Sequence, residues 1–114
     1  MEARPAHLGD ITAIKVFKDG HKFATRGMDD AMKLWDNRIL KQPINSFAGL
    51  MNLNEHTNIA ISPDQRLIVT GTSSKKQETY GELVFGDCMS GEIVKRMPIC
   101  MDSVVSVAWC ASIN

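Results

Sequence analysis

This sequence of 114 residues has few cysteines and few aromatic residues, no excess of either charge and no long apolar run. The cysteines Cys88, Cys100 and Cys110 are odd in number and show no CxxC spacing, which argues against a disulfide framework and a zinc site. We expect buried, reduced thiols. No apolar run approaches the roughly 20 residues that span a bilayer, and residues 1–5 lack the apolar segment of a signal peptide. We therefore expect an intracellular chain without a membrane partner.

The charge is balanced, with 13 Lys and Arg against 13 Asp and Glu. No overall field would draw the chain onto nucleic acid or an anionic membrane. Only 6% of the residues are aromatic, and Lys75 and Lys76 beside Tyr80 are too few for a nucleic-acid surface. Any partner must be recognised locally. The 44% of hydrophobic residues is enough to build a core in a chain of this length.

The chain contains an internal repeat. VFKDGHKFAT, which starts at Val16, matches ISPDQRLIVT, which starts 45 positions later at Ile61. Each copy has apolar residues, a turn with Asp, and an apolar run ending in Thr, a pattern typical of a hairpin of two short strands. The apolar positions of residues 104–109 match those of 11–16, which indicates a third copy. A period of about 40 to 45 residues is that of a propeller blade.

The pattern predicts an all-β chain, because no segment is convincingly helical. The expected strands of the first repeat are 11–16, 22–26, 31–35 and 43–47, and those of the second are 57–61, 67–71, 82–86 and 92–97. The first repeat closes on Trp35-Asp36, as WD40 repeats do. We therefore expect a WD40 β-propeller fragment of about two four-stranded blades plus the first strand of a third. The expected boundaries are 7–50, 51–99 and 100–114.

Four residues of the first repeat are spaced to form a hydrogen-bonded relay inside one small sheet. We expect Asp29 to accept from an imidazole N–H of His7, whose other nitrogen faces Thr25. The Trp35 indole N–H would donate to Thr25. Such a relay would hold the blade together.

The second repeat departs from this pattern. A polar loop follows Thr70, Phe85 stands where we expect the Trp, and no His or turn Asp occupies the matching places. The second blade must rely more on apolar packing, and we expect it to be the weaker one.

Two repeats and a strand cannot close a ring, since propellers have four to eight blades and closure removes their exposed edges. The chain is therefore expected to be a fragment of a longer protein. The alternative is a chain that completes its ring by self-association. In either case the exposed edges predict a sticky surface.

Two segments, ATRGMDDAMKLWD at 24–36 and LIVTGTSSKK at 67–76, resemble the gastrulation-defective family of WD40 proteins. The most distinctive residue is Arg26, since a common repeat has a small residue there. The resemblance covers about residues 7–109. It implies a nuclear scaffold, with a cytoplasmic pool as the alternative, that is linked to ubiquitin ligases and the DNA damage response.

The residues Trp35-Asp36-Asn37-Arg38 match the WDxR motif by which many propellers dock on the damage-binding adaptor of cullin-4 RING ubiquitin ligases. A guanidinium at the rim can fork onto a carboxylate or carbonyls, so Asp36 and Arg38 are the candidate docking residues. The longer consensus favours Gly at the position of Arg26 and an aliphatic residue at Met32 and Asn37. The alternative is that Arg38 is an exposed strand-end charge and that the chain is a purely structural propeller segment.

Catalysis and cofactor binding are not expected. A Thr25 hydroxyl that also bonds an indole inside a sheet would reach no substrate. His21 and His56 are expected to face solvent, without a second ligand at metal spacing. The segment 71–75 lacks the spacing of a phosphate loop. The loop 73–80 is expected to be solvated, with a partner surface or a phosphorylation target as the alternative.

Overall fold

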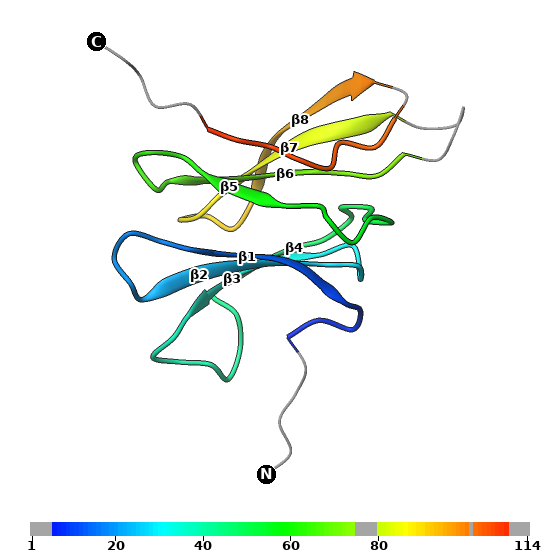
Figure 1. Cartoon of the computed structure of the whole chain (residues 1–114). Coiled ribbons are helices and arrows are strands. Elements are labelled where there is room, and N and C mark those ends of the chain that lie inside the picture. The colour runs from blue at the N-terminus through cyan, green and yellow to red at the C-terminus, as the bar shows by residue number, and fades with distance from the viewer. Residues whose placement is uncertain (1–5, 75–79, 101, 110–114) are drawn as a thin grey trace.

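The computed structural model describes residues 6–74, 80–100 and 102–109. Two four-stranded antiparallel sheets lie one above the other, and each is formed by one repeat (Figure 1). The described residues contain no helix, and therefore none that could cross a membrane. The chain thus has the all-β architecture of two propeller blades.

Each sheet keeps its strands in chain order. The first blade consists of β1 (Ile11–Val16), β2 (Lys22–Gly27), β3 (Met32–Asp36) and β4 (Asn45–Phe47). The second blade consists of β5 (Ile59–Ile61), β6 (Leu67–Gly71), β7 (Gly81–Asp87) and β8 (Ile93–Cys100). Short connections allow this meander, since antiparallel neighbours need only a few linking residues.

The core lies between the two sheets. Because side chains alternate along a strand, one face of each sheet points into this interface. The first blade supplies Phe17, Ala24, Met32, Leu34 and Phe47, the segment between the blades supplies Leu50, and the second blade supplies Ile59, Ile68 and Val84; all are buried. Burial of this apolar surface joins the blades.

The strands differ from the expected ones mainly at their ends. β4 and β5 are shorter than expected, while β8 runs on to Cys100. The described residues 102–109 form no strand. They lie beside the second blade, where Val104 N donates to the Thr72 carbonyl and Asn58 N to the Val105 carbonyl. The strand of a third repeat therefore stays a prediction.

The register of the second blade corrects the expected place of the Trp counterpart. Phe23 on β2 pairs with Trp35 on β3, and the repeat places Ile68 at the position of Phe23. Ile68 pairs with Gly86, so Gly86 and not Phe85 is the counterpart of Trp35. A Cβ at Gly86 would lie 2.7 Å from Cε1 of Phe47. Glycine is thus required here because the Phe47 ring of the first blade occupies the space.

The cysteines are less buried than expected. Cys88 is half-buried, and burial raises the pKa of its thiol to about 11. Cys100 is exposed at the end of β8, where the edge strand faces solvent, so the expectation of burial is wrong for this residue. Cys110 lies outside the described residues.

Candidate functional site

The structure brings the four relay residues into contact. His7 Nδ1 lies 2.8 Å from Asp29 Oδ1, and His7 Nε2 lies 2.6 Å from Thr25 Oγ1. The Trp35 indole donates to the same hydroxyl over 2.9 Å. Trp35 also stacks on Phe23, its cross-strand neighbour, with ring centroids 6.3 Å apart. The group connects the segment before β1, strand β2, the β2–β3 turn and β3.

The chemistry of the acceptors fixes the proton positions in this relay. Burial opposes ionisation of Asp29, but hydrogen bonds from His7 and from Leu8 N outweigh it and lower the Asp29 pKa below its ordinary value of 3.8. An ionised carboxylate only accepts, so the imidazole proton is on Nδ1. In the neutral imidazole Nε2 then accepts from Thr25, whose oxygen accepts from Trp35.

This arrangement is structural in character. The Thr25 and His7 residues are only 2% and 5% exposed, and each polar atom of the relay has a partner. A nucleophile must be able to approach a substrate carbonyl or phosphorus atom. The Thr25 hydroxyl has no such approach, and its contacts stabilise the sheet instead.

Asp36 and Arg38 form a tight pair at the opposite end of the blade. Arg38 donates to Asp36 from Nε over 2.9 Å, from Nη2 over 2.7 Å and from its backbone N over 2.9 Å. The side-chain bond, the backbone bond and the charge of Arg38 lower the Asp36 pKa far below its ordinary value. The carboxylate is 14% exposed but the Arg38 side chain is 63% exposed. The guanidinium is therefore held in place by one edge while its Nη1 edge stays open.

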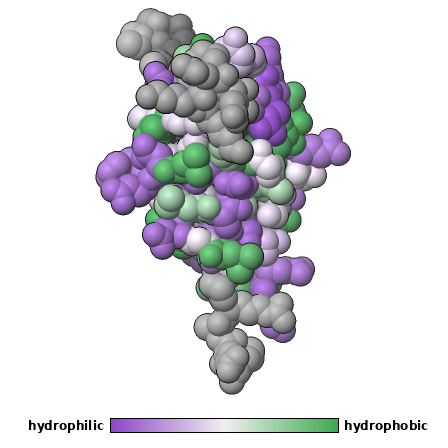
Figure 2. All heavy atoms as spheres, turned by 90° about the vertical axis from the view of Figure 1, so that its right-hand side faces the viewer, coloured by the Kyte–Doolittle hydropathy of each residue, from purple (hydrophilic) through white to green (hydrophobic). Residues whose placement is uncertain are grey.

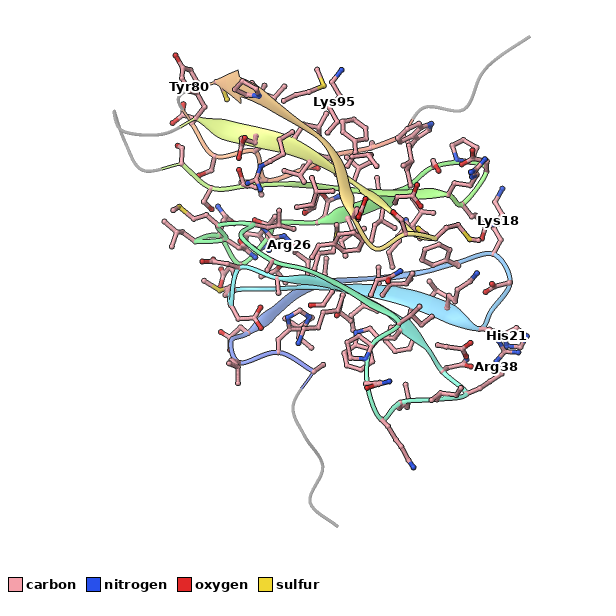
Figure 3. All side chains as sticks on the ribbon, turned by 180° about the vertical axis from the view of Figure 1, so that it is seen from behind. Lys18, His21, Arg26, Arg38, Tyr80 and Lys95 are labelled. Atoms are coloured by element: carbon pink, nitrogen blue, oxygen red, sulfur yellow. The ribbon has the colours of Figure 1, made fainter. Side chains whose placement is uncertain are left out.

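Other polar residues gather at this end of the molecule. Figure 3 shows Lys18 and His21 on the same side of the molecule as Arg38, where the β1–β2 turn meets the segment after β3. Asn37 connects the two segments, since its backbone N donates to the His21 carbonyl and its side chain to the Gly20 carbonyl. The exposed position of His21 agrees with the expectation, and so does that of His56. This end forms a polar rim around Arg38.

Arg26 has a role that its position in the sequence did not reveal. Its side chain is fully buried at the interface of the two blades, as the label in Figure 3 shows. The guanidinium donates to the Thr70 hydroxyl and to carbonyls of the first blade, the interblade segment and the second blade, namely Gly27, Ala31, Leu50, Met51 and Gly71. The shortest of these bonds is 2.6 Å, from Nη2 to the Leu50 carbonyl.

Among the residues that the structure describes, no carboxylate forms an ion pair with the Arg26 guanidinium. Burial lowers the Arg26 pKa to about 10, and the more distant Asp30 and Asp29 offset part of this effect. The side chain therefore stays protonated at neutral pH and is stabilised by backbone dipoles. Only a planar group with five N–H donors can satisfy so many acceptors at once, which explains why arginine occupies this position.

The described residues of the second blade form no relay of their own. Thr70, the counterpart of Thr25, accepts from Arg26 Nε over 3.1 Å and donates to the Asn58 carbonyl over 2.8 Å. Ser73 replaces part of the turn aspartate: its hydroxyl accepts from Leu53 N, just as Asp29 accepts from Leu8 N. Arg26 of the neighbouring blade thus takes the place of the tryptophan donor, and the Asn58 carbonyl takes the place of the histidine acceptor.

The loop 73–80 is only partly open to solvent. Ser73 is buried, with its hydroxyl bonded to Leu53 N, while Tyr80 is exposed. The residues 75–79 lie outside the described part, so the proposed partner surface and the phosphorylation target remain predictions. Figure 2, which views the end of the molecule that carries this loop, shows hydrophilic and hydrophobic residues interspersed.

Within the described ranges, no group of three or more His, Cys, Asp and Glu side chains is placed to hold a metal ion. The buried side-chain nitrogen and oxygen atoms of the same residues all have hydrogen-bond partners. The polar groups of the interior are therefore satisfied by the protein itself, as expected for a packed scaffold.

Comparison with known proteins places these features in a family context. The chain is 38% identical over 113 residues to the gastrulation defective protein 1 homolog of Drosophila melanogaster. The matched region covers 97% of this chain and 17% of that protein. It is 35% identical over 105 residues to WD repeat-containing protein 70 of Xenopus laevis. This matched region covers 92% of the chain and 17% of the relative.

The human WD repeat-containing protein 70 is 37% identical over 77 residues, which are 68% of this chain. No protein-family model matches the chain. The chain spans about a sixth of the length of the curated relatives with the longest matches. The two antiparallel four-stranded sheets and the similarity to these relatives lead to one conclusion. The chain is a WD40-repeat chain of the gastrulation-defective type, homologous to part of those longer proteins.

Proposed function

We propose that the chain is part of a protein-interaction scaffold, and that Asp36 and Arg38 dock it on the damage-binding adaptor of a cullin-4 RING ubiquitin ligase in the nucleus. The relatives support the scaffold role because they are WD repeat proteins. The adaptor is proposed because residues 35–38 match the WDxR motif. The link to the DNA damage response and the nuclear location are proposed from the resemblance to the gastrulation-defective family. No catalytic step is part of this proposal.

One observation carries the docking proposal: the Arg38 guanidinium is oriented by Asp36 and remains 63% exposed. A preoriented arginine loses less conformational entropy on binding than a free one. The open Nη1 edge can donate to a carboxylate or carbonyl of a partner. Figure 3 shows Arg38 at the periphery of the first blade, where a second protein can approach.

The test is capture of the purified chain by the purified adaptor, with Arg38→Ala as the variant. We expect a loss of capture of about tenfold or more, which corresponds to about 1.4 kcal/mol of binding free energy. Because the substituted Arg38 side chain is exposed, the melting temperature should hardly change. Lys41→Ala, an exposed cation in the same β3–β4 loop, is the matched control and should leave capture unchanged.

A purely structural role is the competing function, and the Asp36–Arg38 geometry also suits it. The bond from Arg38 N to the Asp36 side chain closes a local turn after β3. Under this hypothesis Arg38→Ala would not affect capture by the adaptor. Equal capture of the variant and the unsubstituted chain would therefore remove the docking claim.

A further inference from the structure

A small cleft lies between the blades at the inner strands β1 and β5. Its volume is about 190 Å³, and its lining combines apolar side chains with two lysines: Lys15, Val16, Phe17, Lys18, Ile61, Ser62, Pro63 and Gln65. Pockets that enclose a drug-sized molecule measure roughly 300 to 1,000 Å³. This cleft therefore suits one inserted side chain.

The two lysines of the cleft have no ionic partner among the residues that the structure describes. Lys15 and Lys18 are exposed, and neither ammonium group takes part in an ion pair or hydrogen bond there. By contrast, Lys22 pairs with Asp19, and Lys33 donates to the Ala6 carbonyl. The positive charges at the cleft are thus available to an anionic partner.

Lys15 occupies an unusual place for a lysine. By strand alternation it shares a face of β1 with Ala13 and Phe17, which pack toward the second blade. An apolar residue would bury surface at this position, whereas a lysine must extend its ammonium group to water. Packing of the blades therefore does not explain the choice of Lys15.

The second repeat shows what this part of a blade needs for folding alone. The 45-residue offset aligns Lys15 with Ala60 and Lys18 with Pro63. Both pairs occupy the same positions of the inner strand and the following turn, yet the second repeat forms its sheet without either charge. The two lysines are accordingly a feature of the first repeat and of this cleft.

The wall of the cleft is fixed by a contact between the blades. Gln65 has a left-handed backbone with φ 60°, where the first repeat has Gly20 with φ 73°. A glutamine disfavours this conformation, but its side-chain oxygen accepts from Lys18 N over 2.8 Å. The bond holds the turns of the two blades together and keeps Lys18 beside the apolar lining.

We propose that this cleft binds an acidic peptide segment of a partner protein. Two carboxylates pair with Lys15 and Lys18, and an apolar side chain between them enters the space beside Phe17, Ile61 and Pro63. A nucleic-acid strand is the less suitable occupant, since it would require a longer basic groove and aromatic platforms for its bases. The lining of this cleft includes neither Asp36 nor Arg38, and the proposal does not depend on their docking role.

The experiment measures fluorescence anisotropy of a labelled peptide, EELEE, with the full 114-residue chain. We expect saturable binding that weakens as salt is added, because exposed charges are screened. Lys15→Ala/Lys18→Ala should weaken it about tenfold or more. The matched control Lys41→Ala/Lys95→Ala removes two exposed lysines elsewhere and should change affinity less than about twofold. The peptides QQLQQ and EEGEE test the charge and the apolar side chain separately.

Three results would overturn the proposal: no saturable binding of EELEE, equal binding by the Lys15→Ala/Lys18→Ala variant, or displacement of the peptide by an oligo-dT strand as readily as by unlabelled EELEE. Thermal melting followed by circular dichroism checks that the variants fold. Should the double alanine variant fail to fold, Lys15→Gln/Lys18→Gln replaces it, with Lys15→Arg/Lys18→Arg expected to retain binding.

Discussion

The two blades place the same residue, a threonine on the second strand, in different hydrogen-bond networks. Thr25 of the first blade bonds to His7 and Trp35, and the connection to Asp29 is completed within that blade. Thr70 of the second blade bonds instead to Arg26 of its neighbour. The first blade satisfies its threonine internally, whereas Thr70 donates to the Asn58 carbonyl and takes its donor from a side chain across the interface.

This difference shows how a degenerate repeat can keep a satisfied interior. Loss of the histidine and tryptophan would leave buried polar groups without partners, each at a cost of about 1 to 3 kcal/mol. Arg26 supplies the donor that Trp35 provides in the first blade, and it also bonds to the segment between the blades. The second blade therefore depends on the first for part of its polar contacts, and this dependence can be tested by substitution.

Removal of Arg26 should have the largest effect. In Arg26→Leu, the Leu50 and Gly71 carbonyls and other buried acceptors lose a donor, so we expect a loss of about 4 to 6 kcal/mol in the free energy of unfolding. Arg26→Lys keeps the charge but cannot bond to all three segments, and should lose about half as much. Urea denaturation measures the loss in each of the two variants. Arg66→Leu, which replaces an exposed arginine, is the control. Equal denaturation midpoints for Arg26→Leu and the control would refute the bridging role.

Removal of Trp35 tests the internal relay of the first blade. Trp35→Ala should destabilise the chain by about 3 to 5 kcal/mol, since a large buried aromatic leaves a cavity. Trp35→Phe keeps a ring beside Phe23 but loses the indole N–H, and should cost about 1 kcal/mol. The same denaturation assay applies. If Trp35→Phe were as harmful as Trp35→Ala, loss of the indole bond to Thr25, which both variants share, and not packing of the ring would dominate.

Gly86→Ala sharpens the comparison at the position that corresponds to Trp35. The added methyl group would meet the Phe47 ring, so we expect a loss of about 1 to 3 kcal/mol from overpacking. The double variant Phe47→Leu/Gly86→Ala should recover part of this loss, because the smaller side chain can yield space. Strict additivity of the two single changes would contradict the contact.

The smallest expected effect is the contribution of Asp29 in the first blade to the pH dependence of stability. The Asp29 pKa is lowered in the folded chain, so its ionised form stabilises the fold above pH 3.8, and this contribution is lost as the pH falls further toward the folded pKa. Asp29→Asn should therefore flatten the acid limb of the melting temperature below pH 3.8. Asp64→Asn makes the matching change in the β5–β6 turn, and its acid limb provides the comparison with the second blade. An unchanged acid limb in Asp29→Asn would argue against the relay.

Local sequence patterns predicted much of this fold. The turn residues and apolar alternation placed eight strands, with deviations only at their ends, because a hairpin is set by residues close in the chain. The spacing of Thr25, Asp29 and Trp35 likewise follows from the geometry of one sheet. His7 could be included because the loop before β1 returns to the same sheet.

The counterpart of Trp35 could not be predicted reliably. Phe85 is the nearer aromatic in the sequence, but the register of β6 and β7 places Gly86 opposite Ile68. A shift by one residue turns a side chain to the other face of a sheet, and local composition does not encode that shift when a long loop connects the strands. The exposure of Cys100 was missed for a related reason, since it depends on how far an edge strand continues.

By itself, the sequence determined the repeat period, the strands and the relay of the first blade, because all three depend on contacts within one hairpin or one small sheet. Only the tertiary structure decided that Arg26 serves the second blade, that Phe47 requires a glycine at position 86, and that Lys15 and Lys18 border a cleft. These features arise where two sheets meet. The relative position of two sheets is set by packing over their whole interface, which no short segment of the chain specifies.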